Sequence, residues 1–183
     1  MAKILVSACL LGCQCRYDGA SKPCEKVLAL AQDPENVLIP VCPEQMGGLT
    51  TPRNPSERQR NEEDVVLPLF LNGPDGNLPP QAGAESEVMA RPGAKSITLS
   101  QPRALIMNDG TDVSENYARG VKIALQIAAL NRIDYAILKS GSPSCGKGLI
   151  YDGSFSGTKV PGNGVTTDAL LAAGYKVISE EDL

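Results

Sequence analysis

Short apolar runs in this chain lead into cysteines at three places. Residues 3–8 precede Cys9, residues 37–41 precede Cys42, and residues 136–138 lead through a Ser-Pro-Ser turn to Cys145. Continuous apolar runs of this length predict strands that are buried on both faces, as in a parallel sheet covered by helices. The carboxyl ends of parallel strands line one crevice. We therefore expect these thiols to meet at one edge of a sheet, where they could bind a metal ion or an iron–sulfur cluster.

The order of the predicted elements indicates an α/β fold. Strand-like runs lie at residues 3–8, 37–42, 104–107, 134–139 and 175–179, and helical patterns lie at 23–32, 113–131 and 166–173. Asp112 and Glu115 have the spacing of a capping box at the start of the longest helical pattern. Alternating strands and helices predict a single Rossmann-like, three-layer domain over residues 1–183, with a mainly parallel sheet.

A long segment in the middle of the chain breaks this alternation. Residues 54–103 are rich in proline and glycine, and we expect them to form an extended loop or lid beside the crevice. Within this segment, residues 65–71 are a candidate edge strand. Arg53, Arg58 and Arg60 could form a local basic patch near its start, although acidic residues flank them.

The composition excludes several classes of function. The 183 residues contain no histidine, so Ser-His-Asp triads, Cys-His dyads and histidine-rich zinc sites are impossible. There is no apolar stretch of the about 20 residues that span a bilayer and no signal-peptide pattern, so we expect a cytoplasmic protein without a membrane partner. Its six cysteines should then stay reduced and serve metal binding or catalysis. The net charge of −4 disfavours nucleic acid as the partner, and the oligomeric state stays open.

The other N-terminal cysteines leave alternative sites open. Cys13, Cys15 and Cys24 follow Cys9, and the four could form a zinc site, although Cys-x-Cys is tight for structural zinc. The run Cys-Leu-Leu-Gly-Cys-Gln-Cys resembles the start of a radical-SAM motif, but it is one residue short between its second and third cysteines. We expect Cys13 and Cys24 to be small, partly buried hydrophobic residues, and the role of Cys15 stays open.

Polar residues near the cysteines are candidates for catalysis. Glu44 follows Cys42 by two residues, and in a chain without histidine it is the leading candidate for a general base. The same carboxylate could instead cap a helix or lie on the surface. Ser142 and Ser144 lie in a small-residue loop before Cys145, which would let a ligand approach the backbone but could also be a plain turn.

The pattern becomes specific when five short segments are taken together. They occur in the order Ser-Ala-Cys-Leu-Leu-Gly at 7–12, Cys-Arg-Tyr-Asp-Gly at 15–19, Val-Cys-Pro-Glu-Gln at 41–45, Ser-Pro-Ser-Cys-Gly at 142–146 and Tyr-Asp-Gly-Ser-Phe-Ser-Gly at 151–157. With these segments the chain resembles the thiouracil desulfidase family over nearly its whole length, except for the middle loop. Gln14, Met46 and Thr50 depart from the family pattern.

This resemblance implies a function and a cofactor. The function is the non-redox desulfuration of a thiolated pyrimidine such as thiouracil, a small molecule, with release of sulfide and the oxo base. The resemblance also implies Glu44 as the catalytic glutamate and Ser142 as a serine that contacts the substrate. The implied cofactor is a [4Fe-4S] cluster with one iron open to the substrate sulfur, held by Cys9, Cys42 and Cys145. A zinc-binding or redox-sensing module, or a desulfidase of thiolated tRNA, remains an alternative.

Overall fold

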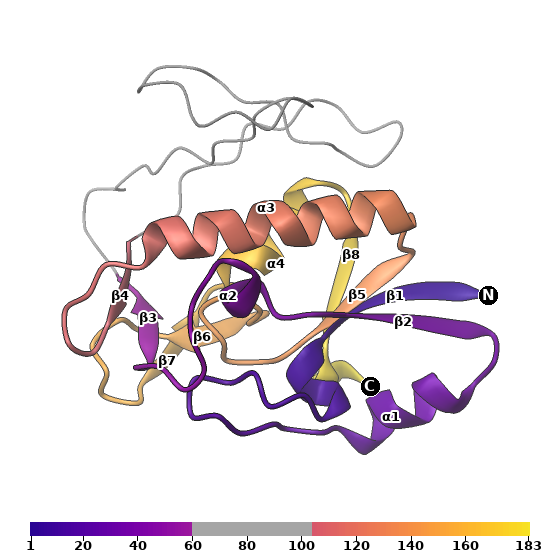
Figure 1. The fold of residues 1–183 in the computed structure, drawn as a ribbon, viewed down its shortest axis with the longest axis horizontal. Coiled ribbons are helices and arrows are strands. Elements are labelled where there is room, and N and C mark those ends of the chain that lie inside the picture. Colours follow the sequence, from indigo (N-terminus) through magenta and orange to yellow (C-terminus); the bar gives the residue numbers. More distant parts are fainter. Residues whose placement is uncertain (60–103) are drawn as a thin grey trace.

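A parallel sheet of four strands in the order β2-β1-β5-β8 forms the centre of the protein (Figure 1). The computed structural model describes residues 1–59 and 104–183. The strands of this sheet are β1 (Ala2–Ser7), β2 (Asn36–Val41), β5 (Tyr135–Leu138) and β8 (Lys176–Ser179). The helices are α1 (Glu25–Gln32), α2 (Pro43–Met46), α3 (Ser114–Asn131) and α4 (Val165–Ala172), with short 3-10 helices η1 (Ala8–Leu11) and η2 (Glu180–Asp182).

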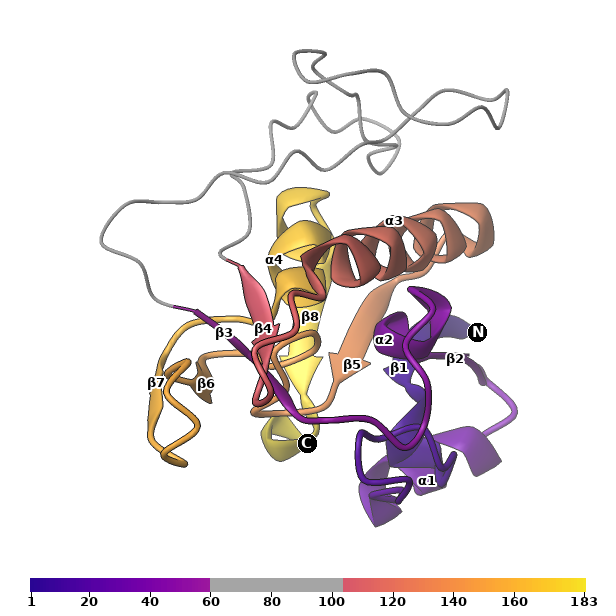
Figure 2. The same cartoon turned by 60° about the vertical axis from the view of Figure 1, so that its left-hand side comes forward.

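Helices cover both faces of the sheet, which gives three layers. Figures 1 and 2 show α3 and α4 on one face and α1 on the other. In β1, Leu5 packs into the cluster with α3 and α4, whereas Ile4 and Val6 pack into the cluster with α1. In β5, Leu138 and Ile137 divide in the same way, because successive strand residues point to opposite faces. The predicted three-layer α/β fold with a parallel sheet is therefore confirmed.

The β2 strand differs from its prediction. It pairs with β1 at the edge of the sheet, and its Val37 and Pro40 are exposed. Proline lacks a backbone N–H and is tolerated in an edge strand, where one side of the strand has no neighbour to bond. The expectation of burial on both faces is therefore correct for β1 and β5 and wrong for β2.

The strand order changes direction between the neighbouring strands β1 and β5: the chain adds β2 on one side of this pair and β8 on the other. From β1 it passes through α1 on one face and reaches β2, whereas from β5 it passes through α4 on the other face and reaches β8. In open α/β sheets, ligands bind at the carboxyl edge where such a reversal occurs. Cys9 follows β1 and Cys145 lies in the loop after β5, so both come from the strands that flank this point.

Small antiparallel sheets lie beyond the carboxyl edge of the main sheet (Figure 2). One pairs β3 (Ser56–Arg58) with β4 (Leu105–Met107), and the other pairs β6 (Leu149–Tyr151) with β7 (Lys159–Pro161). The strand predicted at 104–107 is therefore present, but it does not belong to the main sheet. The start of the predicted loop at 54–103 therefore differs from its prediction, because it contains the strand β3. The rest of that segment, with the candidate strand at 65–71, lies outside the described residues.

The α3 helix begins slightly differently from the predicted capping box. Its first residue is Ser114, whose N–H donates to Asp112 Oδ1 at 2.9 Å, and Val113 takes the N-cap position. The buried side chains of α3, including Tyr117 and Val121, pack on the sheet. Neither α3 nor any other helix in residues 1–59 and 104–183 combines the length and the apolar character needed to cross a membrane.

Candidate functional site

A cavity of about 550 Å³ lies at the carboxyl edge of the sheet. This volume is within the range of about 300–1,000 Å³ that is typical of small-molecule sites. The ends of β1, β2 and β5 contribute to its wall, as does the turn between β6 and β7. The cavity brings together all five residues that the sequence placed at a site, namely Cys9, Cys42, Glu44, Ser142 and Cys145.

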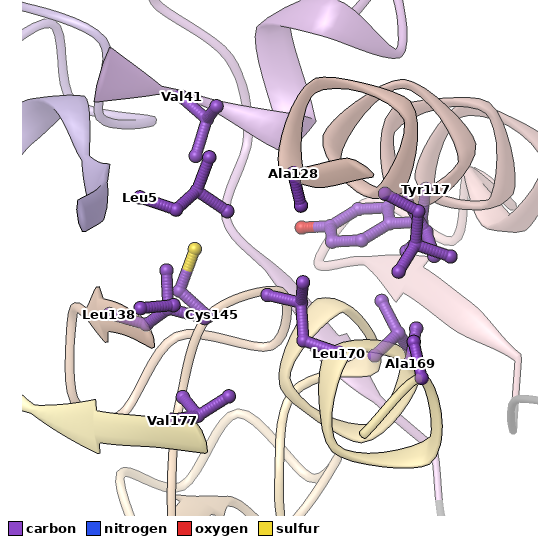
Figure 3. Close-up of a cluster of buried hydrophobic side chains, with 14 of the residues drawn as sticks. Leu5, Val41, Tyr117, Ala128, Leu138, Cys145, Ala169, Leu170 and Val177 are labelled. Carbon is purple, nitrogen blue, oxygen red and sulfur yellow. The ribbon is translucent and has the colours of Figure 1, made fainter. Parts of the chain in front are cut away.

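Each of the three cysteines is held by the structure that follows a strand. Cys9 is buried in η1, directly after β1, and Cys42 is the N-cap residue of α2, directly after β2. Cys145 is buried in the turn after β5 and belongs to the core cluster drawn in Figure 3. This turn is tight, since a Cβ atom on Gly146 would lie 2.6 Å from the carbonyl oxygen of Ser142. The sulfur positions are therefore fixed by short, well-packed connections.

Cys15 adds a fourth thiol to the cavity. It is buried, its thiol contacts those of Cys9 and Cys42, and its carbonyl oxygen accepts a hydrogen bond from Cys42 Sγ at 3.7 Å. Cys13 is exposed, and neither Cys13 nor Cys24 lines the cavity. The structure thus does not assemble the alternative site of four N-terminal cysteines.

Burial and crowding raise the pKa of several of these thiols. The contact with Cys15, followed by burial, raises the pKa of Cys42, and burial raises the pKa of Cys145 to about 12. At Cys15 the contact with Cys42 lowers the pKa, but the contact with Cys9 together with burial outweighs it and raises the pKa to about 11. A cation bound beside such thiols favours their thiolate forms, so the binding of a metal or cluster here would release protons.

The donor set fits an iron–sulfur cluster better than a single metal ion. Thiolate sulfur is the soft ligand that iron–sulfur clusters require. Across the described ranges 1–59 and 104–183, no group of three or more Cys, Asp or Glu side chains is arranged to hold one ion. A cluster has several irons, and each cysteine binds a different one, so its ligands stand further apart than the ligands of one zinc ion. Cys9, Cys42 and Cys145 line one cavity without forming a site for a single ion, which suits a cluster.

Glu44 lies in the first turn of α2 and is fixed by a buried arginine. Arg53 donates from Nε to Glu44 Oε2 at 3.1 Å, and its Nη2 contacts the same oxygen. The side chains of Arg53 and Glu44 are 4% and 14% exposed. Arg53 Nη1 also donates to the carbonyl oxygen of Cys15 at 3.3 Å and to Thr51 Oγ1 at 3.1 Å. The carboxylate is therefore held in one orientation, with Oε2 occupied.

Ser142 lies between this carboxylate and the backbone around Cys145. Its Oγ accepts hydrogen bonds from the N–H groups of Ser144 and Cys145, each at 3.1 Å. Because both lone pairs of Oγ are used, its single proton is left to donate, and it points to Glu44 Oε1 at 3.4 Å. The hydroxyl of Ser144 is fully buried against Thr166, at 2.8 Å, and it does not line the cavity.

Arg53 is the residue at this site that sequence reasoning missed. The sequence suggested only that Arg53, Arg58 and Arg60 might form a basic patch. In the structure Arg53 is paired with Glu44, and Arg58 is paired with Asp168 at 2.7 Å. The basic patch is therefore wrong for these two arginines, because carboxylates neutralise both, while Arg60 lies outside the described residues.

Comparisons with known proteins give a consistent result. The model of the family described as 2-thiouracil desulfurase matches residues 4–77 and 80–182. The uncharacterized protein YbbK of Bacillus subtilis (strain 168) is 39% identical over 180 residues, which are 98% of this chain and 97% of YbbK. Among solved structures, the [4Fe-4S]-dependent thiouracil desulfidase TudS matches with a TM-score of 0.71 and 34% identity, over 100% of this chain and 93% of TudS. This chain belongs to the 2-thiouracil desulfurase family.

Proposed function

We propose that this protein is a [4Fe-4S]-dependent desulfidase that converts a thiolated pyrimidine base such as 2-thiouracil into the oxo base and hydrogen sulfide. The observation that carries the proposal is the meeting of Cys9, Cys42 and Cys145 with Glu44 in one cavity, in a chain similar to TudS over its whole length. Water supplies the oxygen, and the reaction exchanges sulfur for oxygen without net transfer of electrons.

Cys9, Cys42 and Cys145 are the ligands that we assign to the cluster. When bound, such a cluster supplies a Lewis-acidic iron without a cysteine ligand, to which a thiocarbonyl sulfur can bind. The protein contributes a buried, sulfur-rich wall at the point where the strand order reverses. Cys15 lies beside two of the ligands and is left as a neighbouring thiol.

Glu44 is the group that we assign to proton transfer. Arg53 occupies Oε2, so Oε1 is the oxygen that faces Ser142 and the cavity. A carboxylate in this position can take the proton of a water molecule that attacks the ring carbon next to the sulfur. Ser142 can donate its hydroxyl proton to the same centre, because its own acceptor positions are already bonded to backbone N–H groups.

A free base suits this site better than thiolated tRNA. The net charge is −4. Arg53 and Arg58, which the sequence suggested as part of a basic patch, are both ion-paired with carboxylates. A phosphate backbone needs clustered and available cations. All six cysteines are free thiols, which suits a reducing compartment, so we assign the reaction to the cytoplasm.

The direct test is anaerobic reconstitution with iron and sulfide, followed by turnover of 2-thiouracil and 4-thiouracil. We expect about four irons per chain and one sulfide released per oxo base formed. Glu44→Gln should keep the iron and slow sulfide release by about 100-fold or more, the usual size of an acid–base effect. Glu115→Gln, an exposed substitution on α3, is the matched control and should leave both unchanged.

Distinct results would contradict distinct parts of the proposal. A wild-type protein that is loaded with iron but releases no sulfide from either base would rule out the desulfidase activity. Zinc in place of iron would support a zinc-binding module. Near-normal turnover by Glu44→Gln would leave the activity standing and would remove Glu44 from its assigned role. A loss of tRNA sulfur at rates that fall steeply with salt would favour the tRNA alternative.

A further inference from the structure

The turn between β6 and β7 contains an aromatic residue in an unusual backbone conformation. Phe155 has φ = +57°, and in the described residues Arg132 at the end of α3 is the other non-glycine residue with positive φ. Bulky side chains avoid this region of backbone space, and they persist there when the surrounding structure holds them. Such positions cluster at active sites and at segments that clamp ligands. This turn lies within residues 151–157, and neither Glu44 nor any of the three cysteine ligands comes from it.

A buried carboxylate from a distant strand holds this turn. Glu57 Oε2 accepts the backbone N–H of Gly153 at 2.9 Å and that of Phe155 at 3.0 Å. Gln59 Nε2 donates to the carbonyl oxygen of Gly153 at 2.9 Å. Glu57 is only 7% exposed and lies in β3. A charged acceptor makes strong bonds to backbone N–H groups, so β3 fixes the conformation of the turn.

The result is an aromatic ring at the cavity that contains the cysteines and Glu44. Phe155 is 37% exposed although it is a large apolar residue, and it lines this cavity. Tyr17 and Tyr151 line it too, but each has a cation over its ring, Arg16 at 5.7 Å and Lys159 at 5.6 Å. Of the three described aromatic residues that line the cavity, Phe155 alone has no cation over its ring.

We propose that Phe155 stacks on the pyrimidine ring of the substrate and that Glu57 is the positioning residue that holds Phe155 in place. The inference rests on the proposed desulfidase function and adds a specificity element to the same cavity. A flat, conjugated thiobase fits a partly exposed phenyl ring, because base and ring both gain from parallel stacking. The hydrogen bonds from Gly153 and Phe155 to Glu57 place the ring without using the side chain of Phe155 itself.

The test compares kinetic constants of the reconstituted enzyme for 2-thiouracil. Phe155→Leu keeps an apolar side chain and removes the ring, and it should raise KM by about 5- to 100-fold, the range that base–aromatic stacking supports. Because the reacting groups are untouched, kcat should change by less than about 3-fold. Phe155→Tyr keeps the ring and should stay close to wild type. Leu130→Ala, at an exposed leucine on α3, is the control for surface apolar loss.

Glu57 is tested through its coupling to Phe155. Glu57→Ala should raise KM in the same direction, whereas Glu57→Gln keeps an acceptor oxygen and should restore most of the affinity. In a Phe155→Leu background, Glu57→Ala should add little to KM, because Glu57 acts through the ring. Iron content and the visible absorption of the cluster are recorded for every variant, so that loss of the cofactor is seen separately.

The outcomes separate this inference from the function on which it rests. An unchanged KM in Phe155→Leu, or a fall in kcat alone, overturns the stacking role while the desulfidase function stands. Additive effects of Glu57→Ala and Phe155→Leu overturn the positioning role of Glu57. If the wild-type enzyme with full iron content releases no sulfide, the proposed function fails first, and this inference fails with it.

Discussion

Arg53 and Glu44 form an ion pair that is nearly closed to solvent at the edge of the cysteine cavity. The side chain of Arg53 is 4% exposed, and it also donates to the carbonyl oxygen of Cys15. The pair therefore ties the first turn of α2 to the loop that carries Cys15. A buried charge pair contributes little net stability by itself, but removing one partner leaves the other charge buried and unpaired. This geometry makes Arg53 a positioning residue for Glu44.

Substitution of Arg53 should lower activity without releasing the cluster. In Arg53→Ala, Glu44 loses the group that fixes Oε2, so we expect kcat to fall by about 10-fold or more because the orientation of the carboxylate is lost. The free energy of unfolding should fall by about 2 kcal/mol, since the remaining carboxylate is partly buried. Arg53→Lys keeps the charge but not the two-pronged contact, and it should lie between Arg53→Ala and wild type.

The measurements for Arg53 are single-turnover sulfide release, iron content and urea denaturation. Lys147→Ala is the control, because it removes a surface ion pair with Asp182 that does not line the cavity. That variant should lose less than about 1 kcal/mol and keep its kcat. Normal turnover in Arg53→Ala would show that Glu44 does not depend on this contact.

The cysteines should divide into two groups by their effect on iron content. Replacing Cys9, Cys42 or Cys145 by serine removes a soft ligand, and we expect each variant to retain much less than about four irons per chain after reconstitution. Cys13→Ser is the control at an exposed site outside the cavity, and it should load normally. Cys15→Ser should keep the iron but change the absorption or EPR spectrum, because its thiol contacts those of two ligands. Loss of iron in Cys13→Ser, with retention in Cys145→Ser, would point to the N-terminal cysteines.

The meeting of the three cysteines could be predicted from the sequence because it depends on local patterns. The apolar runs of β1 and β5 reveal strands buried on both faces, and parallel strands carry their carboxyl ends to one edge. Cys9, Cys42 and Cys145 are therefore expected at the same edge of the sheet, and the adjacency of β2, β1 and β5 then brings them together there.

The partners of Glu44 and Glu57 could not be predicted in this way, because they depend on where distant segments return. Arg53 follows Glu44 by nine residues along an irregular segment, and Glu57 bonds Phe155 across 98 residues. The order of the strands is equally non-local. The apolar sequence of β2 resembles that of β1, although β2 is an edge strand. The apolar residues at 104–107 predict a strand, but they do not reveal that this strand pairs with β3 outside the main sheet.

The phenol of Tyr117 should make stability depend on alkaline pH. It is buried beneath β3 and shares a hydrogen bond of 2.6 Å with Ser56 Oγ. Burial, with a smaller effect of the Glu44 charge, raises the pKa of Tyr117 well above its usual value of 10.0. A raised pKa in the folded state means that this group stabilises the protein fully below pH 10. Above about pH 10 the unfolded tyrosine ionises while the folded one does not, so stability is lost at up to about 1.4 kcal/mol per pH unit.

The check is a comparison of wild type with Tyr117→Phe in urea, in metal-free protein under reducing conditions. Near pH 8 the wild type should be more stable by about 1 kcal/mol, because the variant leaves Ser56 without its partner. This advantage should shrink and then reverse above about pH 10, since the variant lacks the ionising phenol. A difference between the two proteins that stays constant to pH 11 would contradict the buried, neutral phenol.

Gly120 allows α3 to approach α2 closely enough to place Glu44. A Cβ atom at Gly120 would collide with the carbonyl oxygen of Pro43. Since α2 begins at Pro43 and carries Glu44, Gly120→Ala must push α2 away from α3 and move the carboxylate with it. We expect a loss of about 1–3 kcal/mol from overpacking, and a larger relative loss in kcat, because a displacement of about 1 Å can cost 100-fold in rate. Gln126→Ala, exposed on the same helix, should change neither quantity. Denaturation and single-turnover assays on protein of matched iron content would measure both effects, and wild-type kcat in a destabilised Gly120→Ala would show that the position of α2 does not limit the reaction.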